Sequence, residues 1–332
     1  MTVRIGTRAS KLALTQTQQT ADRLAAVGGF PVELVHIRTE GDVRTGSLSQ
    51  MGGTGVFVAA LRDALLIESC DVAVHSLKDL PTGAAVGLSI AATPPRVDVR
   101  DVLCARDGLT LAELPGGAKV GTGSPRRAAQ LRAARPDIEV LDIRGNVDTR
   151  LNRVSGLPGN AVDEVVEGKS NDLDAVVLAA AGLERMGRLD TVSEFFDTSV
   201  MLPAPGQGAL AIECRTPDAP QRDGSVDGGN VVLAQALAAL NDDDTRLAVT
   251  AERAVLARLE AGCAAPVGAY AYRKGSMLHL EAVVCAVDGT RTVREKKATD
   301  GLTEVGATLL GIEVAEQLLA AGAAEIADLA AS

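Results

Sequence analysis

Polar residues that can do chemistry follow an apolar strand pattern in the stretch DVAVHSLKDLP, residues 71–81. The alternating valines indicate a short buried strand, and His75, Ser76, Lys78 and Asp79 stand at its end or just after it. In an open α/β sheet, ligands bind just past the carboxyl ends of the strands. We therefore expect these side chains to line a ligand site. The alternative is a solvated turn in which Lys78 and Asp79 form a surface ion pair.

Two adjacent arginines indicate an anion site further along the chain. Ser124 is a good N-cap and Pro125 a good first helical residue, so a helix should begin here and place Arg126 and Arg127 in its first turn. The helix dipole disfavours each cation there by a few tenths to about 1 kcal/mol, so we expect an anion nearby. Free N–H groups and two guanidinium forks suit a carboxylate or a phosphate. The alternative is that both arginines face solvent or pair with acids elsewhere.

Further arginines stand at the carboxyl ends of predicted strands. Arg144 and Arg185 each follow one, and Arg150 lies in the helix that begins after Arg144. Arg8 and Ser10 follow the first strand of the chain, in a position equivalent to that of Asp79. If the strands are parallel, these side chains converge on shared crevices.

Strands and helices alternate in a βαβ rhythm that predicts two doubly wound α/β domains, followed by an α+β domain. Two Pro/Gly-rich crossovers, at 93–101 and 201–208, can return a later strand to the first domain. Domain 1 is predicted to comprise 1–98 and 204–226, domain 2 to comprise 99–203, and domain 3 to comprise 227–332. The predicted elements of domain 3 are a helix over 244–260 that ends at Gly262, antiparallel strands over 267–272, 278–287 and 290–296, and a last helix over 303–321.

Two segments are long for connections in a compact domain. Residues 41–55 are polar and glycine-rich, and we interpret them as a flexible flap, with a plain disordered insertion as the alternative. Residues 155–172 have the composition of an exposed insertion.

Composition excludes several classes of protein. The chain has 332 residues, 33 basic and 43 acidic side chains, a formal charge of -10 and only 2% aromatic residues, which disfavours nucleic-acid binding. No apolar run is long enough to span a bilayer, and the first residues lack the apolar core of an export signal. We therefore expect a cytoplasmic protein without a membrane partner.

The five cysteines fall into two groups. Cys70, Cys104, Cys214 and Cys285 lie in or beside apolar strand patterns and should be small core residues. Cys263 stands in a loop of small residues after a helix, where a thiol is accessible and a bulky adduct would fit, although an unreactive loop cysteine is the alternative. An odd count without a CxxC pair argues against disulfides or a zinc site.

Six motifs in order along the chain closely resemble the porphobilinogen deaminase family. They are IGTRAS at 5–10, VHSLKDLP at 74–81, GTGSPRR at 121–127, RGNVDTRL at 144–151, PGQGA at 205–209 and EAGCAAP at 260–266. The resemblance runs from Arg4 to about Gly268 and is weaker beyond. It implies two lobes like those of periplasmic-type binding proteins, plus a smaller α+β domain with a three-stranded antiparallel sheet.

The resemblance also implies the chemistry. Cys263 would carry a dipyrromethane cofactor through a thioether, and four porphobilinogen molecules would be joined head to tail, with loss of ammonia, into hydroxymethylbilane. Asp79 matches the catalytic carboxylate. The matching cofactor-binding residues are Ser76, Lys78, Asp79, Thr122, Ser124, Arg126, Arg127, Arg144 and Arg150. The matching substrate-binding residues are Arg8, Ser10, Arg144, Arg150, Arg185 and Gln207. The family further implies a monomer and a possible transfer of product to uroporphyrinogen-III synthase.

Two other functions remain open at this stage. A two-lobed anion receptor would share the same pair of lobes but would explain neither the third domain nor Cys263. A phosphoryl-transfer enzyme would use the arginines, but the chain has no P-loop and no clear set of metal-binding carboxylates.

Overall fold

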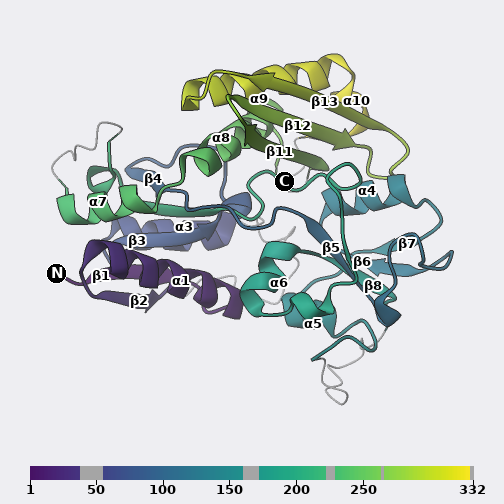
Figure 1. Cartoon of the computed structure of the whole chain (residues 1–332), viewed down its shortest axis with the longest axis horizontal. Helices are drawn as coiled ribbons and strands as arrows, with labels where there is room; N and C mark the ends of the chain where they lie inside the picture. The colour runs from purple at the N-terminus through teal and green to yellow at the C-terminus, as the bar shows by residue number, and fades with distance from the viewer. Residues whose placement is uncertain (38–54, 160–171, 222–228, 263–264, 330–332) are drawn as a thin grey trace.

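A computed structural model describes residues 1–37, 55–159, 172–221, 229–262 and 265–329 (Figure 1). Two α/β lobes lie side by side, and a third domain packs against both of them. Most of the predicted 41–55 flap, most of the 155–172 insertion and Cys263 itself lie outside the described residues.

Lobe 1 is built on a five-stranded sheet of order β2-β1-β3-β10-β4. Three parallel strands are joined through helices, whereas β10 runs antiparallel to both of its neighbours. The elements are β1 (Val3–Thr7), α1 (Lys11–Gly28), β2 (Val32–His36), α3 (Gly55–Leu66), β3 (Val72–Ser76), the 3-10 turn η1 (Leu77–Asp79), β4 (Leu88–Ala92) and β10 (Leu210–Arg215), followed by the 3-10 turn η4 (Thr216–Asp218). The prediction that the second crossover returns a strand to lobe 1 is confirmed.

Lobe 2 has the same topology, with the strand order β7-β6-β8-β5-β9. Here β5, which enters from the first crossover, is the antiparallel strand. The elements are β5 (Asp101–Ala105), β6 (Lys119–Gly121), α4 (Pro125–Ala134), β7 (Glu139–Leu141), α5 (Val147–Leu151), β8 (Ala175–Ala179), α6 (Ala180–Met186) and β9 (Glu194–Phe195), with 3-10 turns η2 (Arg106–Gly108) and η3 (Leu189–Thr191). Each lobe thus receives one strand from a crossover, so the two crossovers connect the lobes, and we refer to these two segments as the hinge.

The third domain packs helices on a three-stranded antiparallel sheet. It contains α8 (Asp243–Arg258), β11 (Val267–Lys274), β12 (Met277–Cys285), β13 (Thr292–Thr299), α9 (Glu304–Ala320) and α10 (Ala323–Ile326). The predicted stop of the first helix at Gly262 is wrong, because α8 ends at Arg258 and Glu260 takes the left-handed conformation with φ of 53°. A local hydrogen bond from the Ala261 N–H to the Leu256 carbonyl closes the helix end there.

Helix α7 (Val231–Leu240) lies in the core of lobe 1, although it falls within the 227–332 segment predicted to form domain 3. Its buried face, which includes Leu233 and Leu237, packs against Val3, Ile5 and Leu24 of lobe 1. Composition alone did not separate α7 from the alanine-rich helices that follow, because both have apolar faces of similar content.

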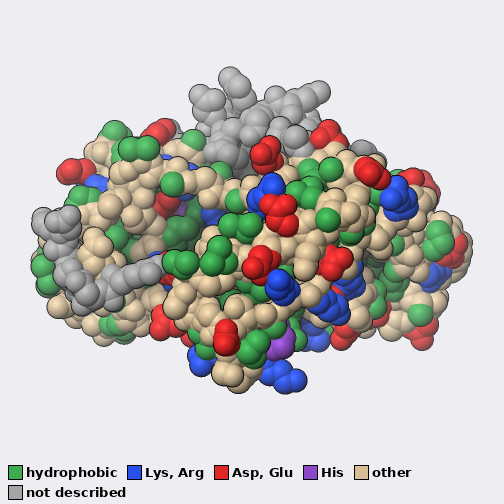
Figure 2. Space-filling view, turned by 90° about the horizontal axis from the view of Figure 1, so that it is seen from above, with side chains coloured by type: hydrophobic (Ala, Val, Ile, Leu, Met, Phe, Trp, Pro, Cys, Tyr) green, Lys and Arg blue, Asp and Glu red, His purple; other side chains and the backbone are tan. Residues whose placement is uncertain are grey.

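The four described cysteines agree with the sequence predictions, and the surface carries charges of both signs. Figure 2 shows acidic and basic side chains interspersed on the face of the molecule seen from above. No helix in the described ranges is both long enough and apolar enough to cross a bilayer. Cys70, Cys104, Cys214 and Cys285 are buried free thiols, as predicted, and burial raises their pKa values to about 11 or 12.

Candidate active site

The turn after β3 carries the predicted catalytic residues. Ser76 ends the strand, Leu77 is buried, and Lys78 and Asp79 are half-buried within η1. The Ser76 hydroxyl accepts a hydrogen bond from Gln16 Nε2 at 3.2 Å. Neither charged side chain is fully exposed, whereas the solvated-turn alternative places both on the surface.

Strand β1 brings a second pair of predicted residues to the same edge of the sheet. It lies parallel and adjacent to β3, so Arg8 and Ser10 follow β1 where η1 follows β3. Ser10 caps α1, with its hydroxyl accepting a hydrogen bond from the Ala13 N–H at 3.3 Å. Both side chains are half-buried.

His75 belongs to the core of lobe 1, and the expectation that it lines the site is wrong. Its side chain is 6% exposed, and Nε2 lies 3.1 Å from Oε2 of Glu213 on β10. Arg62 on α3 pairs with the same carboxylate at 2.9 Å. Burial favours the neutral acid, but the hydrogen bonds to His75 and Arg62 outweigh it and hold the pKa of Glu213 below its usual range.

Helix α4 begins as predicted. The Ser124 hydroxyl caps it by accepting a hydrogen bond from the Arg127 N–H at 3.5 Å, Pro125 is its first residue, and the buried Thr122 accepts a hydrogen bond from the Ser124 N–H at 3.3 Å. The helix start therefore has the geometry that the sequence predicted for an anion site.

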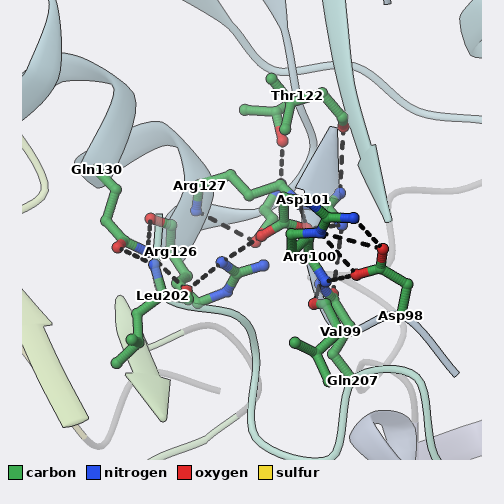
Figure 3. Close-up of polar contacts among 12 residues, drawn as sticks. Asp98, Val99, Arg100, Asp101, Thr122, Arg126, Arg127, Gln130, Leu202 and Gln207 are labelled. Atoms are coloured by element: carbon green, nitrogen blue, oxygen red, sulfur yellow. Dashed lines mark hydrogen bonds and ion pairs between the residues drawn. The ribbon is translucent and has the colours of Figure 1, made fainter. Parts of the chain in front are cut away.

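The anion at this helix start is Asp101, a residue of the protein itself. Figure 3 shows Arg126 and Arg127 pointing toward it. Arg126 Nη1 donates to Oδ2 at 2.7 Å and Arg127 Nε donates to Oδ1 at 2.9 Å, with all three side chains almost fully buried. Burial would raise the pKa of Asp101, but the two guanidinium charges outweigh it and hold this pKa well below the usual range. The alternative of pairing with an acid elsewhere thus holds for both arginines.

The same cluster joins both crossovers. Gln207, on the second crossover, donates from Nε2 to the Val99 carbonyl at 2.8 Å and to Asp101 Oδ1 at 2.9 Å. Its side chain is 1% exposed, and its amide oxygen lies 3.5 Å from Arg127 Nη2. Gln207 therefore joins the two crossovers, and the expectation that its side chain binds substrate is wrong, because the amide is buried and bonded to Val99 and Asp101.

A second buried cluster attaches domain 3 to the hinge. Glu252 on α8 is fully buried and pairs with Arg96 of the first crossover, with Oε1 2.6 Å from Nη1. Its carboxylate also accepts hydrogen bonds from the backbone N–H of Gly206 and of Ala271. Sequence reasoning missed Asp101 and Glu252, because each is a single acid whose arginine partner is distant along the chain.

Three guanidinium groups of lobe 2 lie close to one another. Arg150 is half-buried and donates from Nε to the Gly145 carbonyl at 2.9 Å. Burial lowers its pKa, and the charges of Arg127 and Arg144 lower it further. Arg144 is 47% exposed and pairs with Asp142 at 3.2 Å. This surplus of positive charge would be relieved by an anionic ligand.

Lys78 extends the cationic cluster from lobe 2 to lobe 1. Burial lowers its pKa to about 8, Asp79 partly opposes this, and the charges of Arg127 and Arg126 lower it further. Arg185 on α6 donates to the Gly208 carbonyl at 3.0 Å, and burial lowers its pKa. Helix α6 also contacts α1 of lobe 1 (Figure 1). Lys78 therefore interacts with Asp79 of its own turn and with Arg126 and Arg127 of lobe 2.

The residues present fit a ligand that bears several carboxylates. Arg126 Nε is buried without a hydrogen-bond partner among the described residues. Burial lowers the pKa values of Lys78, Arg150 and Arg185, and neighbouring arginines lower those of Lys78 and Arg150 further. Cys263 lies outside the described residues, but its flanks are described. The Gly262 N–H donates to the Leu329 carbonyl, and the Ala265 N–H donates to the Gly262 carbonyl, so the first flank is tied to the end of domain 3 and the two flanks are tied to each other.

Replacing Asp101 with asparagine is expected to lower the free energy of unfolding by about 3 to 5 kcal/mol. The change leaves Arg126 and Arg127 buried without a counter-charge, which is the costly way to break a buried ion pair. Urea unfolding at pH 7 measures the effect. Asp98→Asn is the matched control, because Asp98 pairs with Arg100 where both side chains are partly exposed and should contribute about 1 kcal/mol or less. Equal losses in the two variants would contradict the prediction.

Known families, relatives and solved structures resemble this chain. The family model described as porphobilinogen deaminase, dipyromethane cofactor binding domain, matches residues 3–223, and the porphobilinogen deaminase C-terminal domain matches residues 246–320. The porphobilinogen deaminase of Cutibacterium acnes is 56% identical over 99% of this chain and 98% of its own, and that of Leifsonia xyli is 52% identical over 98% and 94%. Among solved structures, the methionine-binding protein MetQ matches with a TM-score of 0.41 at 12% identity, covering 71% of this chain and 89% of its own. The chain therefore belongs to the porphobilinogen deaminase family.

Proposed function

We propose that Asp79 is the catalytic carboxylate and that Cys263 covalently carries the dipyrromethane cofactor while four porphobilinogen molecules are joined head to tail into hydroxymethylbilane. The deaminase activity, the dipyrromethane cofactor and the place in tetrapyrrole biosynthesis follow from the family. The assignment to particular residues is supported by one observation above all. The half-buried carboxylate of Asp79 lies beside Lys78, which in turn interacts with Arg126 and Arg127 of the other lobe, and Arg150 and Arg144 add further positive charge near Arg127.

Carboxylate recognition explains why an acidic chain gathers cations here. Each porphobilinogen bears an acetate and a propionate, and guanidinium forks bind carboxylates through two parallel hydrogen bonds. We assign cofactor binding to Ser76, Lys78, Asp79, Thr122, Ser124, Arg126, Arg127, Arg144 and Arg150. We assign substrate binding to Arg8, Ser10, Arg144, Arg150 and Arg185.

Asp79 acts on the charge that develops in the substrate. When bound, the dipyrromethane supplies the pyrrole carbon to which the first substrate is joined. Porphobilinogen loses its amino group as ammonia, which leaves a cation delocalised over the pyrrole ring. A fixed carboxylate near the ring N–H stabilises that cation and assists the proton transfers. The short turn η1 holds Asp79 in place, and the half-buried setting strengthens the attraction.

The partners and the location belong to the same proposal. Porphobilinogen is the substrate that the family implies. The enzyme acts as a monomer in the cytoplasm and passes its product to uroporphyrinogen-III synthase. The four described cysteines are free thiols, which supports a reducing compartment. Membership of the family leaves no support for the anion-receptor or the phosphoryl-transfer alternative.

The intact mass of the denatured protein tests the proposal directly. We expect the mass of the sequence plus two linked pyrroles, and a peptide map that places the adduct on Cys263. A protein isolated without the adduct should gain it when porphobilinogen is added. An unmodified Cys263 after that addition, or an adduct on another residue, would overturn the assignment.

A further inference from the structure

The catalytic turn of lobe 1 is held from behind by one side chain of domain 3. Arg253 on α8 donates from Nη1 to the Leu80 carbonyl at 2.8 Å and from Nη2 to the Pro81 carbonyl at 2.6 Å. These are the two residues that follow Asp79. One planar guanidinium thus fixes two successive peptide groups at the end of η1.

The turn needs such support because its own hydrogen bonds are few. η1 spans only Leu77–Asp79, and within it the Leu80 N–H donates to the Leu77 carbonyl at 3.1 Å. A 3-10 turn has poorer hydrogen-bond geometry than an α-helix, and its last carbonyls have no partners inside the turn. Arg253 supplies partners to the carbonyls that come immediately after the catalytic residue.

Packing from the same face of α8 supports the contact. Val249, one turn before Arg253, lies in a buried cluster with Leu77 and Leu80. Arg253 and Leu77 also line a pocket of about 230 Å³ between lobe 1 and domain 3, so the guanidinium is not enclosed by side chains on every side. With a shorter polar side chain at position 253, the two carbonyls would face this pocket and would gain no new hydrogen-bond donor from the protein.

Helix α8 leads directly to the segment that bears the cofactor. It ends at Arg258, Leu259 is buried in the core of domain 3, and Cys263 follows four residues later. Glu252 immediately precedes Arg253, and its carboxylate binds both crossovers by accepting hydrogen bonds from Arg96 and from the Gly206 N–H. One helix therefore contacts the hinge, the catalytic turn and the attachment segment.

We propose that Arg253 is a positioning residue for the deaminase reaction, which sets the catalytic turn of lobe 1 relative to the cofactor-bearing segment of domain 3. The inference rests on the proposed roles of Asp79 and Cys263. Arg253 acts through Asp79 and does not itself meet the substrate. Its loss should lower kcat and leave KM and the attached cofactor unchanged, because misplacing a reacting group by about 1 Å costs up to about 100-fold in rate.

The test compares two arginines on the same helix. Arg246 also ties α8 to lobe 1, through Nη2 and the Ile90 carbonyl at 3.0 Å, but this hydrogen bond goes to strand β4 and not to the peptide groups that follow Asp79. With both variants confirmed by mass to carry dipyrromethane, we expect Arg253→Gln to lower kcat about 10- to 100-fold and Arg246→Gln to lower it no more than about 2-fold. Arg253→Lys, which can still reach one carbonyl, should recover part of the rate and serves if the glutamine variant does not fold.

A double-mutant comparison separates positioning from general stability. If Arg253 acts through Asp79, combining Arg253→Gln with Asp79→Glu should cost less than the product of the two single effects. Equal losses of kcat in the Arg253 and Arg246 variants, full additivity with Asp79→Glu, or loss of the cofactor from Arg253→Gln would each overturn the inference. Asp79→Asn, assayed alongside, distinguishes the two proposals, because high activity in that variant refutes the role of Asp79 whatever Arg253 does.

Discussion

Changing Asp79 to asparagine is expected to lower kcat by about 10³-fold while the dipyrromethane remains attached. The substitution keeps the size and hydrogen-bonding shape of the side chain but removes the charge that stabilises the substrate cation. Losing one preorganised electrostatic group together with its proton-transfer role typically costs about 10² to 10⁴ in rate. Single-turnover and steady-state rates with porphobilinogen measure the effect, and intact mass confirms the cofactor.

The control for this prediction is Asp107→Asn. Asp107 is an exposed carboxylate in lobe 2 with φ of 58°, a conformation that asparagine tolerates, so its replacement should leave kcat unchanged. If Asp79→Asn kept more than about a tenth of the wild-type rate, the charge of Asp79 would be unnecessary and another group would have to stabilise the cation.

Changing Cys263 to serine is expected to abolish both the covalent adduct and the activity. A hydroxyl is a far weaker nucleophile than a thiolate, so the thioether cannot form. The adduct should not move to another cysteine, because Cys70, Cys104, Cys214 and Cys285 are buried and their raised pKa values keep them as thiols. Intact mass and a pyrrole colour test give the readout. The control is Cys285→Ala, which should keep the adduct.

The pKa of Lys78 is expected to differ between the Cys263→Ser protein and the wild-type protein. In the Cys263→Ser protein, which holds no covalent cofactor, the pKa of Lys78 should lie near the value of about 8 that burial and the neighbouring arginines impose. In the wild-type protein with cofactor attached, nearby pyrrole carboxylates favour the ammonium form, so this pKa should rise. Carbon NMR of the lysine side chain across pH 7 to 10.5 follows the titration. An unchanged or lower pKa in the wild-type protein would mean that the cofactor carboxylates do not lie near Lys78.

The local signals of the sequence were sufficient for most elements and for the position of the turn that carries Asp79. Alternating valines before Asp79, the Ser124 cap with Pro125, and the apolar face of α8 are each encoded within a few residues, because strand pleating and helix capping are short-range properties. The four core cysteines were also predictable, since each lies in or beside an apolar strand.

The partners of the arginines were decided by the tertiary structure. Nothing near Arg126 and Arg127 in the sequence indicates that Asp101, 25 residues earlier, neutralises them, or that Gln207 completes the cluster from the other crossover. Likewise, His75 belongs to the catalytic motif in sequence, yet strand alternation and the return of β10 place it against the buried Glu213.

What the sequence by itself determined is the set of chemical groups and their local geometry: a carboxylate after a strand, arginines at strand ends, and a cysteine in a small-residue loop. Only the tertiary structure decided which cations are already paired, that α7 belongs to lobe 1, and that Arg253 reaches the turn of Asp79 from another domain. The physical reason is that ion pairs and carbonyl contacts form between residues more than 20 positions apart, and their geometry exists only once the two crossovers and α8 have been packed together.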